Sequence, residues 1–262
     1  MTARGDRAGT DYPDAAPGPE APGRWDTGVS WRGLSTGTWL GAVALLLLVV
    51  ALGVAALTAA TVAGWDRAGV EAVGRLRTDS LTPWMKAVTF GSSAPVVLPA
   101  VVAAGLVLWL RSGWLADSVR LVLVVGVGWS AVMALKPVFD RGRPAAAMGD
   151  VLSVEPLVAE PVGASYPSGH TALATGVALA LVWALRHATT AVRVGGALAG
   201  VLLVAVVGLS RVYLGVHYPS DLLGSVLTVT ATTLLLTGLV PGPRPPRDRG
   251  PEHPGPSARL SP

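Results

Sequence analysis

The sequence predicts an all-α, polytopic membrane protein with six transmembrane helices between two disordered tails. Hydrophobic residues make up 51% of the 262 residues and charged residues only 14%, whereas soluble domains carry about 25% charged residues. The mean hydropathy is +0.54. The apolar residues also gather in runs that approach the ~20 residues a helix needs to cross a bilayer. Together these observations favour a chain built in lipid.

Six apolar runs qualify as spans. In chain order they are residues 39–63, 94–110, 117–135, 170–186, 192–209 and 221–240. The predicted membrane domain therefore covers residues 36–240. Residues 1–35 and 241–262 are rich in Pro, Gly and polar residues, which predicts disordered tails. Between the first two spans, residues 65–93 mix charged and apolar side chains, which fits either an amphipathic helix on the membrane surface or a solvated loop.

The distribution of basic residues predicts the orientation of the chain. With the N-terminus inside, twelve of the 20 Lys and Arg residues lie on the cytoplasmic side and eight on the other side. Cytoplasmic loops carry the excess of Lys and Arg in membrane proteins. We therefore expect a multi-pass protein of the plasma membrane with both termini in the cytoplasm.

Composition also excludes several classes of function. The chain contains no Cys, so disulfides, Cys-ligated zinc, iron–sulfur clusters and thiol nucleophiles are excluded. The net charge of +4 is small, and the basic residues are scattered among apolar runs. A nucleic-acid partner is therefore not expected, because such proteins concentrate their basic residues on one face.

Three polar motifs stand at the ends of the predicted spans. They are Lys136 with Arg143-Pro144 after the third span, Pro167-Ser168-Gly169-His170 before the fourth, and Ser210-Arg211, His217 and Asp221 between the fifth and sixth. The loops that join spans three to four and five to six emerge on the same face whatever the orientation. All three motifs are therefore expected at one surface, which is extracytoplasmic if the N-terminus is inside.

The first function these residues suggest is binding of a phosphate. Lys136, Arg143 and Arg211 would be costly at the edge of an apolar bundle without an anion to neutralise them. Arg forks and a Lys point charge suit a tetrahedral phosphate. Ser168 is placed to cap the fourth span, and the free N–H groups of that helix start add a further anion site that Gly169 lets a ligand approach.

The two histidines and one carboxylate suggest phosphoryl transfer. His217 and Asp221 are four residues apart, so in a helical turn the carboxylate can hold one tautomer of the ring. A neutral, oriented imidazole beside a phosphate can act as a nucleophile, and His170 can protonate the leaving oxygen. No metal or cofactor is needed. Taken singly, each residue also fits a membrane anchor or a helix cap, but their expected meeting on one face favours the catalytic interpretation.

These motifs resemble those of the type 2 phosphatidic acid phosphatase family, which shares its site with the vanadium haloperoxidases. The family pattern is Lys-x6-Arg-Pro, then Pro-Ser-Gly-His, then Ser-Arg-x5-His-x3-Asp, and all eleven fixed positions are matched. The resemblance covers about residues 94–240. It implies a six-helix bundle of that family type and a metal-independent phosphatase. It also implies a phosphohistidine at His217 oriented by Asp221, His170 as acid, and a phosphate held by Lys136, Arg143, Ser168, Gly169 and Arg211.

The resemblance narrows the substrate to a phosphate or diphosphate on a lipid headgroup, because the six spans let the lipid chains stay in the bilayer. A polyprenyl diphosphate of the undecaprenyl type is the first expectation, which would make the protein part of cell-wall carrier recycling. Phosphatidylglycerol phosphate and phosphatidic acid are the others. A phosphotransferase using the same site and a non-catalytic lipid-binding protein are the alternative functions. The sequence makes no prediction of oligomeric state.

Overall fold

The computed structural model describes residues 29–30, 35–113, 115–145, 155–159, 163–239 and 242–243. The chain divides into two compact units, of which residues 31–242 form one and residues 1–30 with 243–262 the other. Nearly all of the predicted tails, 1–35 and 241–262, lies outside the described residues. The strands in the described part are β1 (Val29–Ser30) and β2 (Gly242–Pro243).

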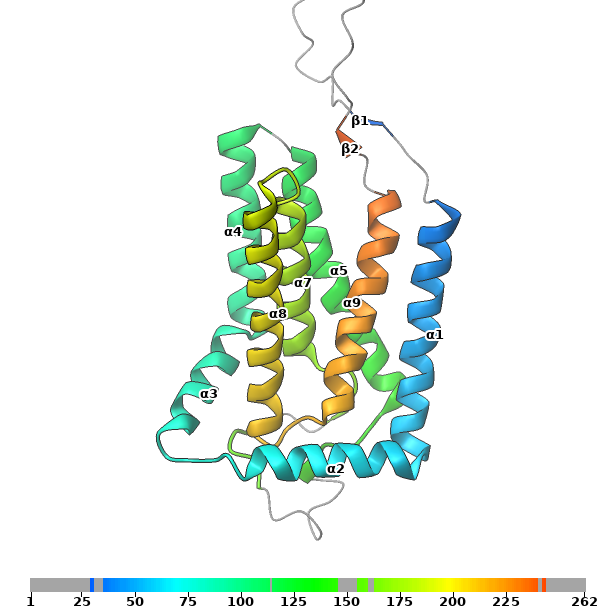
Figure 1. The fold of residues 1–262 in the computed structure, drawn as a ribbon, viewed down its shortest axis with the longest axis vertical. Helices are drawn as coiled ribbons and strands as arrows, with labels where there is room; N and C mark the ends of the chain where they lie inside the picture. The colour runs from blue at the N-terminus through cyan, green and yellow to red at the C-terminus, as the bar shows by residue number, and fades with distance from the viewer. Residues whose placement is uncertain are drawn as a thin grey trace, which may run out of the picture. The chain divides into compact units, whose positions relative to one another are not determined.

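Eight helices are found in the described part of the larger unit (Figure 1). They are α1 (Thr36–Thr58), α2 (Ala60–Gly74), α3 (Leu81–Gly91), α4 (Ala94–Ser112), α5 (Leu115–Phe139), α7 (Gly169–Ala184), α8 (Thr190–Tyr213) and α9 (Pro219–Leu239). The prediction of an all-helical membrane domain is therefore confirmed within these residues.

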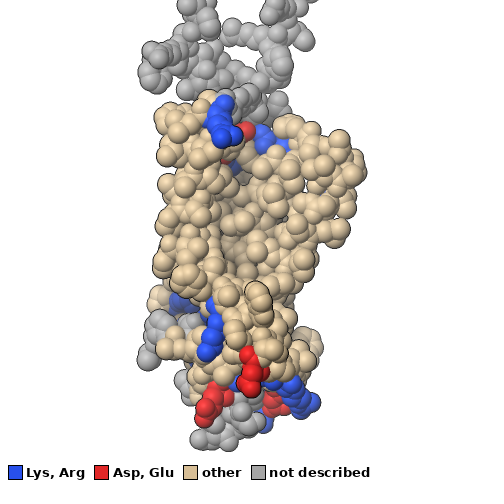
Figure 2. All heavy atoms as spheres, turned by 90° about the vertical axis from the view of Figure 1, so that its left-hand side faces the viewer, with Lys and Arg blue, Asp and Glu red and all other residues tan. Residues whose placement is uncertain are grey.

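Five helices, α1, α4, α5, α8 and α9, are long and apolar enough to cross a membrane. The predicted fourth span corresponds to α7, which is apolar but has only 16 residues. The six-span arrangement thus remains a prediction. On the face that Figure 2 shows, charged side chains gather at the two ends with a wide uncharged band between them, as a bilayer core requires.

The largest difference from the sequence expectation lies after the first span. Residues 39–63 were expected as one span, but α1 ends at Thr58 and the extended backbone of Ala59 turns the chain into α2. Hydropathy could not separate the two helices because residues 59–63 are themselves apolar. Figure 1 shows α2 crossing the ends of the long helices. The sequence left open whether residues 65–93 form a helix or a loop; most of them lie in α2 and α3.

Helix α7 lies at the centre of the packing. It contacts α5, α8 and α9, while α1 packs along α9 and α4 along α5. Residues 171–176, on its first turns, are all buried. Several of them are small, and small residues allow membrane helices to approach closely. The N-terminus of α7 is consequently held among the neighbouring helices, at the end of the bundle where α2 lies.

Candidate active site

The first motif lies where α5 ends. Lys136 is in the last turn of α5, and its Nζ donates to the carbonyl oxygens of Ala164 at 2.8 Å and Ser165 at 3.4 Å. After Phe139 the backbone of Asp140 adopts a left-handed conformation with φ of 39°. Asp tolerates this conformation better than most residues with a Cβ. Helix α5 therefore ends at Phe139, directly before this residue.

The second motif forms the start of α7. Ser168 is the N-cap, and its Oγ accepts from Thr171 Oγ1 at 3.1 Å and from Thr171 N at 3.5 Å, as expected for a capping residue. Gly169 follows as the first helical residue, and a Cβ there would lie 2.8 Å from Met133 Cε and 3.6 Å from Trp129 Nε1. His170 is next and is half-buried. The expected helix N-terminus is therefore present, closely packed on α5.

The third motif spans the end of α8, the loop after it and the start of α9. Arg211 was expected between the spans, but α8 continues to Tyr213, so Arg211 is on the helix and fully buried. His217 lies in the loop and Asp221 in the first turn of α9. His217 Nδ1 and Asp221 Oδ2 are 3.1 Å apart, and both side chains are buried. The contact expected from the spacing of four is present.

Direct hydrogen bonds join the three motifs. Ser168 N donates to Asp221 O at 3.2 Å, and Ser225 Oγ donates to Ser168 O at 2.8 Å, so the starts of α7 and α9 are fastened together. Arg143 Nη1 donates to Val216 O at 3.1 Å, which connects the first motif to the loop that carries His217. The expectation that all three motifs meet at one end of the bundle is therefore met by the structure.

His217 is held in its neutral form. The pKa of His217 is lowered to about 4, mainly by burial and in addition by the positive charges of Arg211 and Lys136, although the hydrogen bond and charge of Asp221 act in the opposite direction. A neutral imidazole whose Nδ1–H donates to Asp221 has a lone pair on Nε2. This is the protonation state that a nucleophile requires.

The structure adds residues that the sequence analysis did not select. Asp221 Oδ1 accepts from Arg141 Nη1 at 2.7 Å, and Arg141 Nη2 donates to Asp66 Oδ2 at 2.6 Å. Thr89 of α3 has its Oγ1 3.4 Å from Arg211 Nη1. Asp66 and Thr89 come from segments outside the motifs, and nothing in their local sequence marks them. The sequence does offer a signal for Arg141, because it is a basic residue between Lys136 and Arg143.

The donor set fits a phosphate better than a metal. Over the residues that the structure describes, no group of three or more His, Asp or Glu side chains is arranged to hold a metal ion. The cations and helix N-terminus of the three motifs are instead groups that bind oxyanions. The arrangement can hold a phosphate and present one neutral imidazole to it.

Comparison with known proteins identifies the family. Residues 117–244 match the PAP2 superfamily. The chain is 34% identical over 181 residues to phosphatidylglycerophosphatase B of Bacillus subtilis (strain 168), covering 66% of this chain and 81% of that protein.

A solved structure agrees with this assignment. A transmembrane PAP2-type phosphatidylglycerolphosphate phosphatase from Bacillus subtilis superposes with a TM-score of 0.65 and 27% identity, over 76% of this chain and 95% of that one. LpxE from Aquifex aeolicus gives a TM-score of 0.49 and 22% identity, over 64% and 92% of the two chains. With the family match, the sequence identity and the Bacillus subtilis fold in agreement, this chain belongs to the PAP2 superfamily and is a multi-pass membrane lipid phosphatase.

Proposed function

We propose that the protein removes a terminal phosphate from a lipid headgroup through a phosphohistidine on His217, without a metal ion. The observation that carries the proposal is the buried His217–Asp221 pair, with 3.1 Å between Nδ1 and Oδ2, at the place where the three motifs meet. Asp221 orients the ring, and the low pKa of His217 keeps it neutral at physiological pH.

The reaction proceeds in two steps. His217 Nε2 attacks phosphorus, the bond between phosphorus and the leaving oxygen breaks, and His170 donates a proton to that oxygen. Water then attacks the phosphohistidine, the phosphorus–nitrogen bond breaks, and His170 takes up a proton from the water. Throughout, the phosphate is held by a set drawn from all three motifs, namely Lys136, Arg143, Ser168, Gly169 and Arg211.

The location of the site fits a lipid substrate. The three motifs lie at the end of the bundle crossed by α2, next to the uncharged band that Figure 2 shows. A headgroup can therefore reach the polar residues while its acyl or prenyl chain stays in the bilayer. The N-terminus of α1 and the C-terminus of α9 lie at the opposite end (Figure 1). With six spans and cytoplasmic tails, the site opens on the extracytoplasmic face of the plasma membrane.

Phosphatidylglycerol phosphate is the substrate we propose to test first. It is the substrate named for the 34% identical Bacillus subtilis relative and for the solved PAP2 structure that covers 76% of this chain. The sequence analysis favoured a polyprenyl diphosphate on family analogy alone. That lipid also ends in a phosphate that the same two steps would release, so it is the second substrate to compare.

The test is phosphate release by the purified protein in detergent, with EDTA present. Phosphatidylglycerol phosphate, undecaprenyl diphosphate and phosphatidic acid are compared, with His217→Ala and His187→Ala alongside. His187 is exposed in the loop after α7, at the end of the bundle away from the site, so it controls for loss of a histidine. We expect release that survives EDTA and His187→Ala and disappears in His217→Ala.

Two outcomes contradict the proposal. Turnover that requires an added metal would exclude the metal-free mechanism. A well-folded protein that releases no phosphate from the three lipids would favour the phosphotransferase alternative. That alternative predicts phosphoryl transfer to an added alcohol, again lost in His217→Ala.

A further inference from the structure

A buried chain of charged groups leads from α2 into the site. Asp221 is fully buried, and Asp66 and Arg141 expose only 1% and 5% of their surface. Arg141 lies between the two carboxylates, with Nη1 2.7 Å from Asp221 Oδ1 and Nη2 2.6 Å from Asp66 Oδ2. The guanidinium thus uses its two ends on two different partners, and its plane is set by both of them.

Ser220 completes the connection. Its N and Oγ donate to Asp66 at 2.9 Å and 2.6 Å, and its Oγ accepts from Arg141 Nη1 at 2.8 Å. Asp66 therefore binds the first turn of α9 one residue before Asp221. The carbon of the Arg141 guanidinium also lies 4.0 Å from the centre of the Tyr218 ring, which stacks against it.

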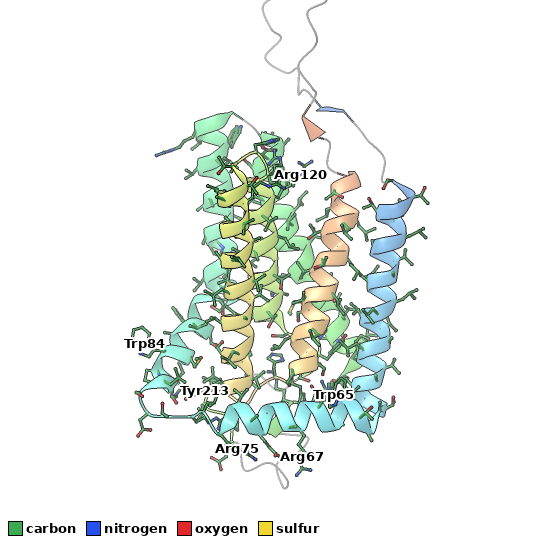
Figure 3. All side chains as sticks on the ribbon, in the orientation of Figure 1. Trp65, Arg67, Arg75, Trp84, Arg120 and Tyr213 are labelled. Carbon is green, nitrogen blue, oxygen red and sulfur yellow. The ribbon has the colours of Figure 1, made fainter. Side chains whose placement is uncertain are left out.

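Helix α2 is seated closely on this part of the site. A Cβ at Gly69 would lie 2.5 Å from Pro219 Cγ, so only glycine permits the observed approach of α2 to the start of α9. Val70, one turn after Asp66, is fully buried in a cluster with Val212 and Tyr218. On the opposite face of α2, Figure 3 shows Arg67 and Arg75 directed away from the bundle.

We propose that Asp66 is a positioning residue of the active site, which acts on His217 through Arg141 and Asp221. This proposal rests on the proposed function, because it assumes that His217 is the nucleophile. Asp66 holds Arg141 in the orientation in which Nη1 reaches Asp221 Oδ1. That contact leaves Asp221 Oδ2 to accept from His217 Nδ1 and from Tyr218 N, at 3.1 Å and 2.9 Å.

The charges of Asp66, Arg141 and Asp221 also support a positioning role for Asp66. Without Asp66, the guanidinium of Arg141 would have Asp221 as its one carboxylate partner among the contacts described above. It could then form a two-pronged pair with both oxygens of Asp221. Such a pair would compete with His217 Nδ1–H for Oδ2, and the ring would lose the partner that fixes its tautomer. A shift of this kind lowers the rate of the chemical step more than the affinity for the lipid.

The alternative is that Asp66 only fastens α2 to the bundle. The two roles differ in what they predict for kcat and for coupling to Asp221. A fastening role lowers the stability of the protein and acts independently of Asp221. A positioning role lowers kcat in the folded protein and has little effect once the Asp221 carboxylate is gone.

The experiment compares Asp66→Asn with Glu71→Gln, a neutralisation on the exposed face of the same helix, where Glu71 pairs with Arg67 at 3.0 Å. Thermal unfolding in detergent, kcat and KM are measured for each with 32P-labelled phosphatidylglycerol phosphate. We expect Asp66→Asn to lower kcat about 10- to 100-fold with KM changed by less than about three-fold. Glu71→Gln is expected to leave both constants unchanged within about two-fold.

The double variant Asp66→Asn/Asp221→Asn is the decisive measurement. We expect Asp66→Asn to lower kcat by less than about three-fold further when Asp221 is already replaced. An undiminished 10- to 100-fold loss in that background, or a wild-type kcat for folded Asp66→Asn, would overturn the proposal. If Asp66→Asn does not fold, Ser220→Ala is the milder variant. It removes the hydroxyl shared by Asp66 and Arg141, and it should lower kcat about three- to ten-fold with KM unchanged. An unchanged kcat there would also overturn the proposal.

These outcomes are distinguishable from failure of the proposed function. If wild type releases no phosphate, or if His217→Ala releases it normally, the phosphohistidine mechanism is wrong. If wild type is active, His217→Ala is inactive and Asp66→Asn keeps its kcat, only the role of Asp66 is wrong.

Discussion

Replacing Asp221 by Asn tests the centre of the site with the smallest change in shape. All three contacts described above for the carboxylate come from donors: Oδ2 accepts from His217 Nδ1 and Tyr218 N, and Oδ1 accepts from Arg141 Nη1. An amide offers one oxygen and one NH2 group. The NH2 group of the substituted side chain must therefore face a donor, whichever way the amide is turned.

Both orientations of the amide damage the site. With its oxygen toward Tyr218 N, the NH2 group faces the Arg141 guanidinium and the buried positive charge loses a partner. With the amide turned over, the NH2 group faces His217 Nδ1, which must then accept a hydrogen bond. The proton moves to Nε2, and the nucleophilic lone pair is lost.

The expected loss of kcat and the expected loss of stability follow from these broken contacts. An Asp-to-Asn change beside a catalytic His, which leaves the geometry intact but sets the wrong tautomer, lowers kcat by about 10⁴-fold in Ser-His-Asp enzymes. Breaking a buried ion pair from one side costs about 3–5 kcal/mol of stability. Because Arg141 keeps Asp66 as a partner, we expect the stability cost at or below the lower end of that range and a kcat loss of about 10³- to 10⁴-fold.

The assay measures kcat for the release of labelled phosphate in detergent, together with thermal unfolding. Asp79→Asn is the control, because Asp79 is exposed in the turn between α2 and α3. The reasoning is refuted if Asp221→Asn folds and keeps a kcat within about ten-fold of wild type, since the tautomer of His217 would then not depend on the carboxylate.

Three further predictions concern protonation, packing and inhibition. Because burial lowers the pKa of His217 to about 4, unfolding takes up a proton between that value and the ordinary pKa of about 6.5. The free energy of unfolding should therefore fall as the pH falls through this window, and it should fall less in His217→Gln. An NMR titration that gives His217 a pKa near 6.5 would contradict its burial. Gly224→Ala places a Cβ 2.5 Å from the ring of buried Tyr166, so it should lower the free energy of unfolding by about 1–3 kcal/mol; an unchanged melting temperature would show that the ring moves freely. Orthovanadate should inhibit phosphate release competitively by occupying the phosphate site, whereas inhibition by EDTA would contradict the metal-free mechanism.

Hydropathy predicted the long helices because a bilayer imposes one strong requirement, about 20 apolar residues per crossing. It placed α4, α5, α8 and α9 close to their observed bounds, but it could not detect the turn at Ala59. A change of direction inside an apolar run depends on what the second helix packs against. For α2 those partners are α8 and the start of α9, both far away in sequence.

The motif residues were predictable for a different reason. A phosphate demands cations and N–H groups, a nucleophilic His demands an orienting carboxylate, and span parity brought the segments to one face without any knowledge of packing. The partners of these residues were not predictable in the same way. Arg141 had the right charge in the right segment, but a charge between Lys136 and Arg143 is equally suited to binding phosphate.

The structure places Arg141 beside two carboxylates of the site. Its two ends are occupied by Asp66 and Asp221, and its ring contact is with Tyr218. Two arginines separated by one glycine thus have different contacts, since Arg143 Nη1 donates to Val216 O. We therefore expect them to differ in role. Arg141→Lys and Arg143→Lys should therefore change different kinetic constants. The first should lower kcat, because one ammonium cannot replace a guanidinium that bridges two carboxylates, and the second should raise KM or the inhibition constant for vanadate. Identical profiles for the two variants would mean that both arginines serve the phosphate.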